Sequence, residues 1–263
     1  KLIGLMRKAI QKYDMIQPGD RIAVGVSGGK DSVALLAGLA KLREFMGIPY
    51  EIIAITLDYR FGGVDSDFSE LRELCEQLNV EYVVKPTEIG QIIFDIRKES
   101  NPCSLCARMR RGCLHDAAKE YNCNKIALGH HYDDAVETFV MSLIYEGRIS
   151  CFQPVTDLDR TGIIQIRPML YLHEKTIENF ARREELPIVH NPCPADKNTR
   201  REDIKAAAAK IAEDVRANGR EILEKIWTGY ALADEVKVMV SDFVAGAYIQ
   251  AVLRQKRTVV KRD

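Results

Sequence analysis

The chain has 263 residues, 46% of them hydrophobic, which is enough for one large α/β domain with a buried core. Its 38 basic and 38 acidic residues cancel, so the net charge gives no indication of a nucleic-acid partner. No apolar run approaches the roughly 20 residues that a membrane-spanning helix needs, and the N-terminal residues lack the apolar stretch of a secretory signal. We therefore expect a cytoplasmic protein that makes no membrane contact.

Apolar periodicity predicts helices and strands in alternation along most of the chain. The predicted strands span residues 21–26, 52–57, 80–84, 125–128 and 163–166. The predicted helices span residues 1–15, 31–46, 66–78, 104–121, 133–146, 173–185 and 200–217. Strands that alternate with helices of this length indicate an open, mostly parallel twisted sheet with helices on both faces.

The last forty residues repeat apolar side chains at helical spacing and end in a basic run from Arg254 to Arg262. We predict one domain over residues 1–217 and a helical C-terminal extension over residues 218–263. The basic run is typical of a solvated helix or a disordered end. The apolar positions before it favour self-association as a homodimer.

A glycine-containing loop joins the first predicted strand to the helix that follows, and it reads Ser27-Gly28-Gly29-Lys30-Asp31-Ser32. The glycines let the backbone turn tightly and present N–H groups to an anion, and the helix N-terminus adds partial positive charge. Lys30 supplies a full charge, and the two serines supply hydroxyl donors. The alternative is an ordinary strand-to-helix turn, but these residue types in this order favour a phosphate-binding loop.

The loop differs from a Walker A motif because Asp31 separates Lys30 from Ser32. An acid at this position would repel a phosphate unless Mg²⁺ bridges the two groups, so we predict a metal-linked role for Asp31. The loop resembles that of the PP-loop (N-type) ATP pyrophosphatases. The resemblance implies a HUP-type fold, and it implies that Lys30 and Asp31 act where ATP is cleaved between its α- and β-phosphates to adenylate a substrate oxygen.

A second polar loop follows the strand at 125–128 and reads Gly129-His130-His131-Tyr132-Asp133-Asp134. Ligands of open parallel sheets bind beyond the carboxyl ends of the strands, so this loop should face the same crevice. One aspartate is explained by a helix N-cap, but two exceed what a cap requires. We predict that Asp133 and Asp134 contribute to metal or catalytic chemistry and that Gly129 borders the nucleotide. By the same rule, the end of the second strand, Thr56-Leu57-Asp58, should flank the adenine.

Seven cysteines form no compact disulfide scaffold, and in a cytosolic chain a cysteine cluster is more often a metal or redox site. Cys103 and Cys106 form a Cys-x-x-Cys pair at the start of a predicted helix, where thiolates are favoured. A tetrahedral metal or an iron–sulfur cluster needs at least one further ligand. Cys193, between two prolines, is the best third ligand, and Cys113 is its main rival. The remaining cysteines read as ordinary thiols and are Cys75, Cys123 and Cys151.

Several segments in order resemble the tRNA 2-thiocytidine synthetase branch of the tRNA thiolases over roughly residues 1–210. They are Cys103-Ser-Leu-Cys106-Ala-Arg-Met-Arg-Arg111-Gly112, Ala127-Leu-Gly-His-His-Tyr-Asp-Asp134, Arg167-Pro168-Met-Leu and the isolated Cys193. The resemblance implies a [4Fe-4S] cluster on Cys103, Cys106 and Cys193, with one iron open to bind a sulfide. It also implies that a pyrimidine carbonyl of tRNA, at C2 of cytidine, is adenylated and that its oxygen is then replaced by sulfur. The sulfur donor would be a cysteine desulfurase or free sulfide.

Basic residues beside the cysteines could neutralise ATP phosphates or the tRNA backbone. They are Arg108, Arg110, Arg111, Lys197, Arg200 and Arg201. We predict that Arg110 acts in catalysis and Arg111 in nucleotide binding; the alternative is a solvated basic face. Two other functions stay open: a cluster-free sulfurtransferase that uses Cys106 and Cys193 as a persulfide and disulfide pair, and a nucleotide-binding module or small-molecule adenylating ligase with structural zinc.

Overall fold

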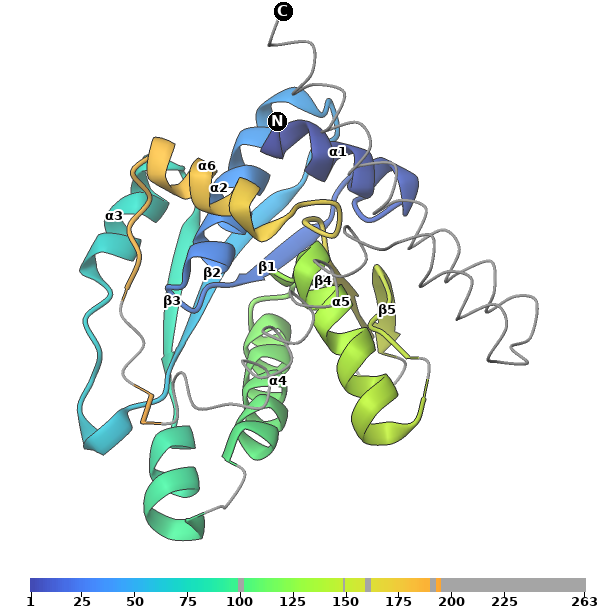
Figure 1. Ribbon diagram of the computed structural model, residues 1–263. Coiled ribbons are helices and arrows are strands. Elements are labelled where there is room, and N and C mark those ends of the chain that lie inside the picture. The colour runs from blue at the N-terminus through green and yellow to red at the C-terminus, as the bar shows by residue number, and fades with distance from the viewer. Residues whose placement is uncertain (99–101, 149, 159–161, 190–192, 195–263) are drawn as a thin grey trace, which may run out of the picture. The chain divides into compact units, whose positions relative to one another are not determined.

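The computed structural model in Figure 1 describes residues 1–98, 102–148, 150–158, 162–189 and 193–194, except the side chains of residues 143 and 144. The chain divides into two units, Lys1–Thr199 and Arg200–Asp263, and all described residues belong to the first. The predicted helix at 200–217 and the predicted extension at 218–263 therefore lie outside the described residues, and so does the predicted boundary between the two domains.

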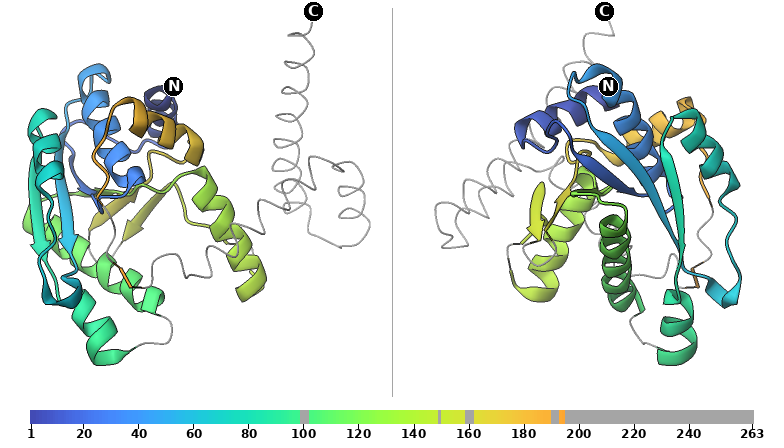
Figure 2. Two further views of the ribbon diagram at one scale, coloured as in Figure 1. Left: turned by 60° about the vertical axis from the view of Figure 1, so that its left-hand side comes forward. Right: turned by 180° about the vertical axis from the view of Figure 1, so that it is seen from behind.

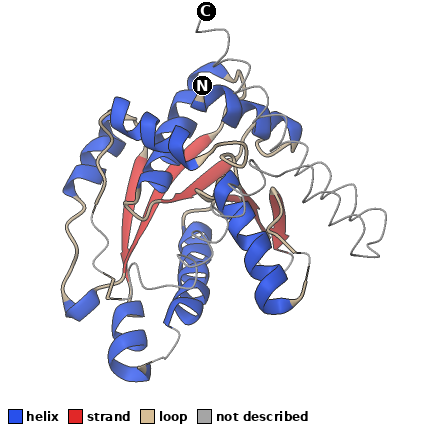
Figure 3. Cartoon of the chain, viewed as in Figure 1, coloured by secondary structure: helices blue, strands red, loops and turns tan. Residues whose placement is uncertain are grey.

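A six-stranded sheet forms the centre of the first unit, and it appears as a single layer of strands in Figure 3. The strands are β1 (Arg21–Gly25), β2 (Glu51–Asp58), β3 (Glu81–Pro86), β4 (Lys125–Ala127), β5 (Val155–Leu158) and β6 (Ile163–Ile166). Their order across the sheet is β3-β2-β1-β4-β6-β5. All neighbouring strands are parallel except β5 and β6, which pair antiparallel at one edge. The sheet confirms the predicted open, mostly parallel α/β fold.

Helices connect these strands, and most of their bounds lie within a few residues of those predicted. The α-helices are α1 (Leu2–Lys12), α2 (Lys30–Phe45), α3 (Ser69–Gln77), α4 (Pro102–Glu120), α5 (Tyr132–Met141) and α6 (Glu174–Arg183). The short helical segments are η1 (Phe61–Gly63), η2 (Gln91–Arg97) and η3 (Ser142–Glu146). No helix in the described ranges is long and apolar enough to cross a membrane.

Helices cover both faces of the sheet, because the alternating side chains of the inner strands are apolar on both sides. In β1, Ile22 and Val24 belong to one buried cluster and Ala23 belongs to another. The first cluster includes buried residues of α1, α2, α3 and α6, whereas the second includes residues of α4. Figures 1 and 2 show α1, α2 and α6 on one side of the sheet and α4 on the other.

The carboxyl ends of the parallel strands β1, β2 and β4 share one edge of the sheet. The glycine-containing loop leaves this edge after β1, and the loop that begins at Gly129 leaves it after β4. The cysteine pair lies at the start of α4. The fold thus brings both predicted polar loops to the edge at which open parallel sheets bind ligands.

Candidate active site

The loop after β1 is closed by the Ser32 hydroxyl. This hydroxyl accepts a hydrogen bond from the Ser27 backbone N–H at 3.1 Å and donates one to the Gly29 carbonyl oxygen at 2.9 Å. Helix α2 begins directly after Gly29, and no side chain of the described residues caps it. Its first N–H groups therefore lack the usual side-chain acceptor, which is the arrangement that binds anions at helix N-termini.

Gly28 fixes the segment that leads to Cys193 on this loop. Its φ of +84° is a conformation that L side chains rarely adopt, and an added Cβ would lie 2.8 Å from the Cβ of Val189. The backbone N–H of Val189 donates a hydrogen bond to the Gly28 carbonyl oxygen at 3.1 Å. The chain four residues before Cys193 is therefore anchored to the phosphate-binding loop.

Lys30 lies between two carboxylates. Its Nζ is 3.1 Å from Asp31 Oδ2 and 3.0 Å from Glu174 Oε1, at the start of α6. Burial lowers the pKa of Lys30, but Asp31 and Glu174 outweigh this effect and leave the pKa raised above its ordinary value. Lys30 therefore carries its positive charge at the mouth of the loop, where a phosphate would use it.

Asp31 offers an oxygen that suits a divalent cation. Its Oδ1 is buried and has no hydrogen-bond partner within the part of the chain that the structure describes. The His131 Nε2 atom lies 3.8 Å from this oxygen and 3.4 Å from Asp134 Oδ2, so the two carboxylates flank one imidazole. Mg²⁺ prefers carboxylate oxygens of this kind, so Asp31 and Asp134 fit the predicted metal.

The loop after β4 uses both of its aspartates in local structure. Asp134 Oδ2 accepts a hydrogen bond from the His131 backbone N–H at 2.9 Å, at the start of α5. Asp133 Oδ2 accepts one from the Glu174 N–H at 2.8 Å and thereby caps α6 from a distant loop. An added Cβ on Gly129 would lie 3.2 Å from the Asp31 carbonyl, so only glycine fits here without displacing the start of α2.

The charges of this loop influence one another. Burial raises the pKa of Asp133, but hydrogen bonds from His131, His173 and the Glu174 N–H outweigh it and hold the pKa well below its usual range. Burial lowers the pKa of His131, yet Asp133, Asp134 and Asp31 leave it raised overall. The Asp133 carboxylate therefore stays ionised at neutral pH, and a positive charge on His131 is favoured.

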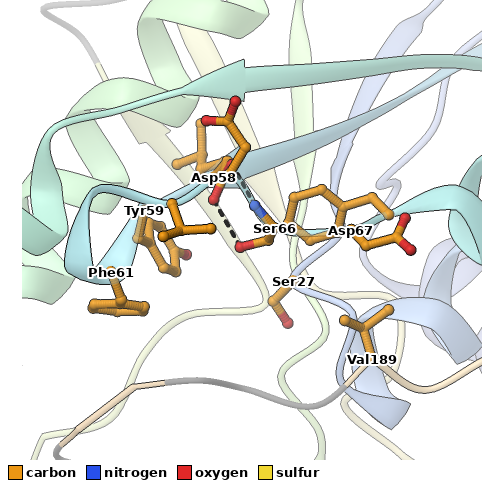
Figure 4. Close-up of a pocket in the computed structure, with 11 residues that line it drawn as sticks. Ser27, Asp58, Tyr59, Phe61, Ser66, Asp67 and Val189 are labelled. Atoms are coloured by element: carbon orange, nitrogen blue, oxygen red, sulfur yellow. Dashed lines mark hydrogen bonds between the residues drawn. The ribbon is translucent and has the colours of Figure 1, made fainter.

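A cavity of about 300 Å³ lies beside the phosphate-binding loop, at the end of β2 (Figure 4). Its lining includes Ser27, Leu57, Tyr59, Phe61 and Val189. The buried carboxylate of Asp58 holds the wall formed by residues 60–66. It accepts hydrogen bonds from the Arg60 N–H at 3.1 Å, from the Ser66 N–H at 3.0 Å and from the Ser66 hydroxyl at 2.9 Å.

Thr56, the residue expected beside the adenine, bonds to its neighbours in the sheet. The residue is buried, and its hydroxyl donates to the Val26 carbonyl oxygen at 2.8 Å and accepts from the Tyr82 hydroxyl at 3.0 Å. Both bonds join neighbouring strands. The predicted contact of Thr56 with the nucleotide stays a prediction, whereas Leu57 and Asp58 line the cavity itself.

The predicted cysteine ligands influence one another electrostatically. Burial raises the pKa of the Cys106 thiol, Arg110 lowers it, and Cys193 and Cys103 raise it further. Cys103 is exposed, whereas Cys106 and Cys193 are half-buried. Within the described ranges, no three His, Cys, Asp or Glu side chains stand close enough together to be a ready-made metal site. The three thiols thus have the chemistry that an iron–sulfur cluster needs, but not a preformed geometry.

The two neighbouring arginines of α4, Arg110 and Arg111, interact with different groups. Arg110 lies near Tyr59, Cys106 and Cys103: local desolvation lowers its pKa, but these groups leave it raised. Arg111 instead acts on His115 and Arg167, whose pKa values are lowered mainly by burial and further by Arg111. Arg110 therefore lies where it could act on the cysteines, and the predicted nucleotide contact of Arg111 stays a prediction.

Sequence reasoning missed two residues that shape the site, Glu174 and Val189. Glu174 reaches Lys30 from 144 positions away in the chain. Val189 meets Gly28 through its backbone, which leaves no mark on residue type. Asp58, by contrast, was among the strand-end residues expected beside the adenine, and it lines the cavity at the end of β2.

The mostly parallel sheet and the Ser-Gly-Gly-Lys-Asp-Ser turn at its ligand-binding edge together define an α/β protein with a phosphate loop of the PP-loop class. The PP-loop domain family matches residues 5–211, and the chain belongs to this family. This finding confirms the resemblance seen in the sequence.

The relatives are tRNA-modifying proteins. The chain is 40% identical over 220 residues to the tRNA-cytidine(32) 2-sulfurtransferase of Syntrophotalea carbinolica, which covers 82% of this chain and 83% of that protein. It is 39% identical over 211 residues to the protein of the same name from Hahella chejuensis, with 78% and 73% covered. Among solved structures, the U34-tRNA thiolase NcsA from Methanococcus maripaludis with its [4Fe-4S] cluster is similar, with a TM-score of 0.64, 25% identity and coverage of 82% and 72%.

Proposed function

We propose that this protein is a cytoplasmic ATP-dependent tRNA sulfurtransferase that replaces the C2 carbonyl oxygen of a cytidine by sulfur. One observation carries the proposal: the nucleotide cavity and the cysteine region share a wall. Tyr59 lines the cavity beside Ser27. Its pKa is raised mainly by burial, lowered in part by Arg110 and raised further by Cys106, so Tyr59 also neighbours the cysteines. A base activated at the loop would need to travel only a short way to meet sulfur.

The chemistry has two steps. In the first, the base carbonyl oxygen attacks the α-phosphorus of ATP, and pyrophosphate leaves. In the second, a sulfur nucleophile attacks the activated C2, and AMP leaves with the original oxygen. Adenylation is needed because the carbonyl oxygen is otherwise a poor leaving group.

The side chains around the loop suit the first step. The uncapped N-terminus of α2 and the Lys30 ammonium would bind the phosphates, and the Lys30 charge would stabilise the negative charge that develops as pyrophosphate departs. Asp31, whose Oδ1 accepts no hydrogen bond from the described residues, and Asp134 would hold Mg²⁺ on the phosphates. The cavity at the end of β2 would take the adenosine.

The cysteines suit the second step. Cys103, Cys106 and Cys193 would hold a [4Fe-4S] cluster, which would supply Lewis-acid chemistry for the delivery of sulfur. Arg110, close to Cys106 and Cys103, would balance the negative charge of the thiolates and orient the incoming sulfur species. A cysteine desulfurase or free sulfide would supply the sulfur.

Nucleoside mass spectrometry of tRNA tests the function. A strain that lacks the gene should lose 2-thiocytidine, and the wild-type protein should restore it, whereas Lys30→Ala should not. Protein purified without oxygen should be brown and should lose its visible absorbance in air. Unchanged thiolated nucleosides in the deletion strain would refute the proposal, and a colourless zinc protein would favour an adenylating ligase instead.

A further inference from the structure

The ion pair between Lys30 and Glu174 is a feature that phosphate binding alone does not require. Glu174 Oε1 lies 3.0 Å from Lys30 Nζ, and Asp31 Oδ2 lies 3.1 Å from the same atom. A single lysine is thus shared by two carboxylates, so this set of three side chains has a net negative charge. The positive charge of Lys30, which should attract a polyphosphate, is therefore already balanced by these carboxylates.

A backbone hydrogen bond holds Glu174 in this position. Its backbone N–H donates to Asp133 Oδ2 at 2.8 Å, which ties the start of α6 to the loop after β4. Its side chain is only 23% exposed, and that of Lys30 is 26% exposed. Screening by water is therefore weaker than for a surface pair, and the carboxylate competes effectively with a phosphate for the lysine.

The wider surroundings are also acidic. Asp133 and Asp134 lie on the adjoining loop, and His131 and His173 are the titratable groups that face them. A metal-free polyphosphate would enter a site whose carboxylates repel it. A polyphosphate that carries a divalent cation would instead bring the positive charge that the carboxylates can share.

We propose that Glu174 is a specificity-determining residue: by holding Lys30, it makes the loop accept polyphosphates as complexes with a divalent cation and reject the metal-free forms. The inference rests on the proposed function, because it takes the loop to be an ATP site. Binding of the metal complex would release Lys30 from Glu174 to the phosphates, since the cation then neutralises the carboxylates.

Calorimetric titration of the full-length protein with inorganic pyrophosphate, in EDTA and in excess Mg²⁺, tests the proposal. The wild type should prefer the magnesium complex strongly. Glu174→Gln should bind metal-free pyrophosphate about tenfold more tightly than the wild type, because one nearby negative charge is removed. Its affinity for the magnesium complex should change much less, so the preference for metal should fall.

Two variants control for structural effects. Glu174→Asp keeps the negative charge and should retain much of the wild-type preference for the magnesium complex. Glu178→Gln removes a charge from an exposed position one turn further along α6 and should behave as the wild type. Thermal melting would show that all variants are folded, because a merely structural role would change the melting temperature without changing the ratio of the two affinities.

The outcomes separate the two hypotheses. If both proteins bind magnesium pyrophosphate, and Glu174→Gln has the same ratio of affinities for the magnesium complex and the metal-free form as the wild type, the role of Glu174 is overturned but the nucleotide site is not. Failure of the wild type to bind pyrophosphate in either form would overturn the nucleotide site itself, and the role of Glu174 with it.

Discussion

The phosphate-binding loop and the cysteine region differ in how completely the fold builds them. The loop lies between β1 and α2, its turn is closed by the Ser32 hydroxyl, and its lysine is held by two carboxylates. The cysteines lie at the start of α4 and beyond Val189, and they do not form a ready-made metal site within the described residues. An anion site made of strand and helix ends is complete once the sheet has folded, whereas a cluster site is completed by the metal it binds.

This difference predicts that a loop without its positive charge loses ATP cleavage while the cysteine region keeps its iron. We expect Lys30→Ala to lower the rate of ATP cleavage by roughly 10²–10³-fold, because the charge that stabilises departing pyrophosphate is lost. Iron content should stay at the wild-type value, since Lys30 does not contact the cysteines. Pyrophosphate release and iron analysis on one preparation measure both. Lys175→Ala, at an exposed position on α6, is the control. Loss of iron with intact ATP cleavage would reverse the two roles.

A change in the cysteine region should have the opposite effect: iron is lost and nucleotide binding is kept. Cys193→Ser should lose iron and thiolation, because two remaining cysteines cannot hold a cluster that needs three ligands. Nucleotide binding should persist, since the loop is complete without the metal. Cys113→Ser is the matched control and should keep iron, because this thiol packs against the core beneath α4. If Cys113→Ser loses the iron and Cys193→Ser keeps it, the third ligand is Cys113.

Gly28 is the point at which the two regions are joined, so a change there should affect both. Gly28→Ala strains a backbone with φ of +84° and puts a Cβ 2.8 Å from that of Val189. We expect a loss of about 1–2 kcal/mol in the free energy of unfolding. Weaker pyrophosphate binding and lower iron retention should accompany it.

The control for this change is Gly4→Ala in α1, where an added Cβ meets nothing within 4 Å. It should stabilise the protein by about 0.5–1 kcal/mol, because alanine is the better helix former. Denaturant unfolding measures both variants. Full iron retention in Gly28→Ala would show that the Val189 contact does not position Cys193.

The parts of the fold that local patterns determine could be predicted from the sequence. The β-branched runs gave β1 and β2 because both faces of these strands are buried. The edge strand β5 was not predicted, since Val155–Leu158 pairs only with β6 and has little apolar alternation. Its pairing with β6 is local, since Leu158 pairs with Ile163, but the polar residues Thr156 and Asp157 at its centre break the apolar pattern that would predict a strand.

In the candidate site, too, contacts between residues close in sequence could be predicted, whereas contacts between residues far apart in sequence could not. The roles of Lys30 and Asp31 stay predictions, but their place in one loop follows directly from their being consecutive in sequence. The contact of Glu174 with Lys30 could not be predicted, because the two residues are 144 positions apart. The strand-end rule identifies the edge of the sheet, and Leu57 and Asp58 line the cavity there. The Thr56 hydroxyl bonds to the Val26 carbonyl oxygen, and its contact with the nucleotide stays a prediction.

The smallest effect concerns Asp133, which joins the loop after β4 to α6 and so to Glu174. Asp133→Ala removes the cap on the Glu174 N–H and should lower the free energy of unfolding by about 1 kcal/mol. Asp133→Asn keeps an oxygen that can accept this bond, so it should lose only the ionic part, the interaction with His131 and His173. Thermal melting with Asp157→Asn, at an exposed position on β5, provides the comparison.

The pH dependence of that ionic part follows from the two shifted groups. The folded pKa of Asp133 is depressed, so its contribution is complete above about pH 3.9 and is lost as the pH falls through the folded value. The folded pKa of His131 is raised, so its contribution is complete below about pH 6.5 and is lost as the pH rises through the folded value. The stability difference between the wild type and Asp133→Asn should therefore be largest between these limits and smaller on either side. A difference that does not vary with pH would mean that Asp133 acts only as a neutral cap, and that the loop after β4 holds α6, and with it Glu174, without help from its charges.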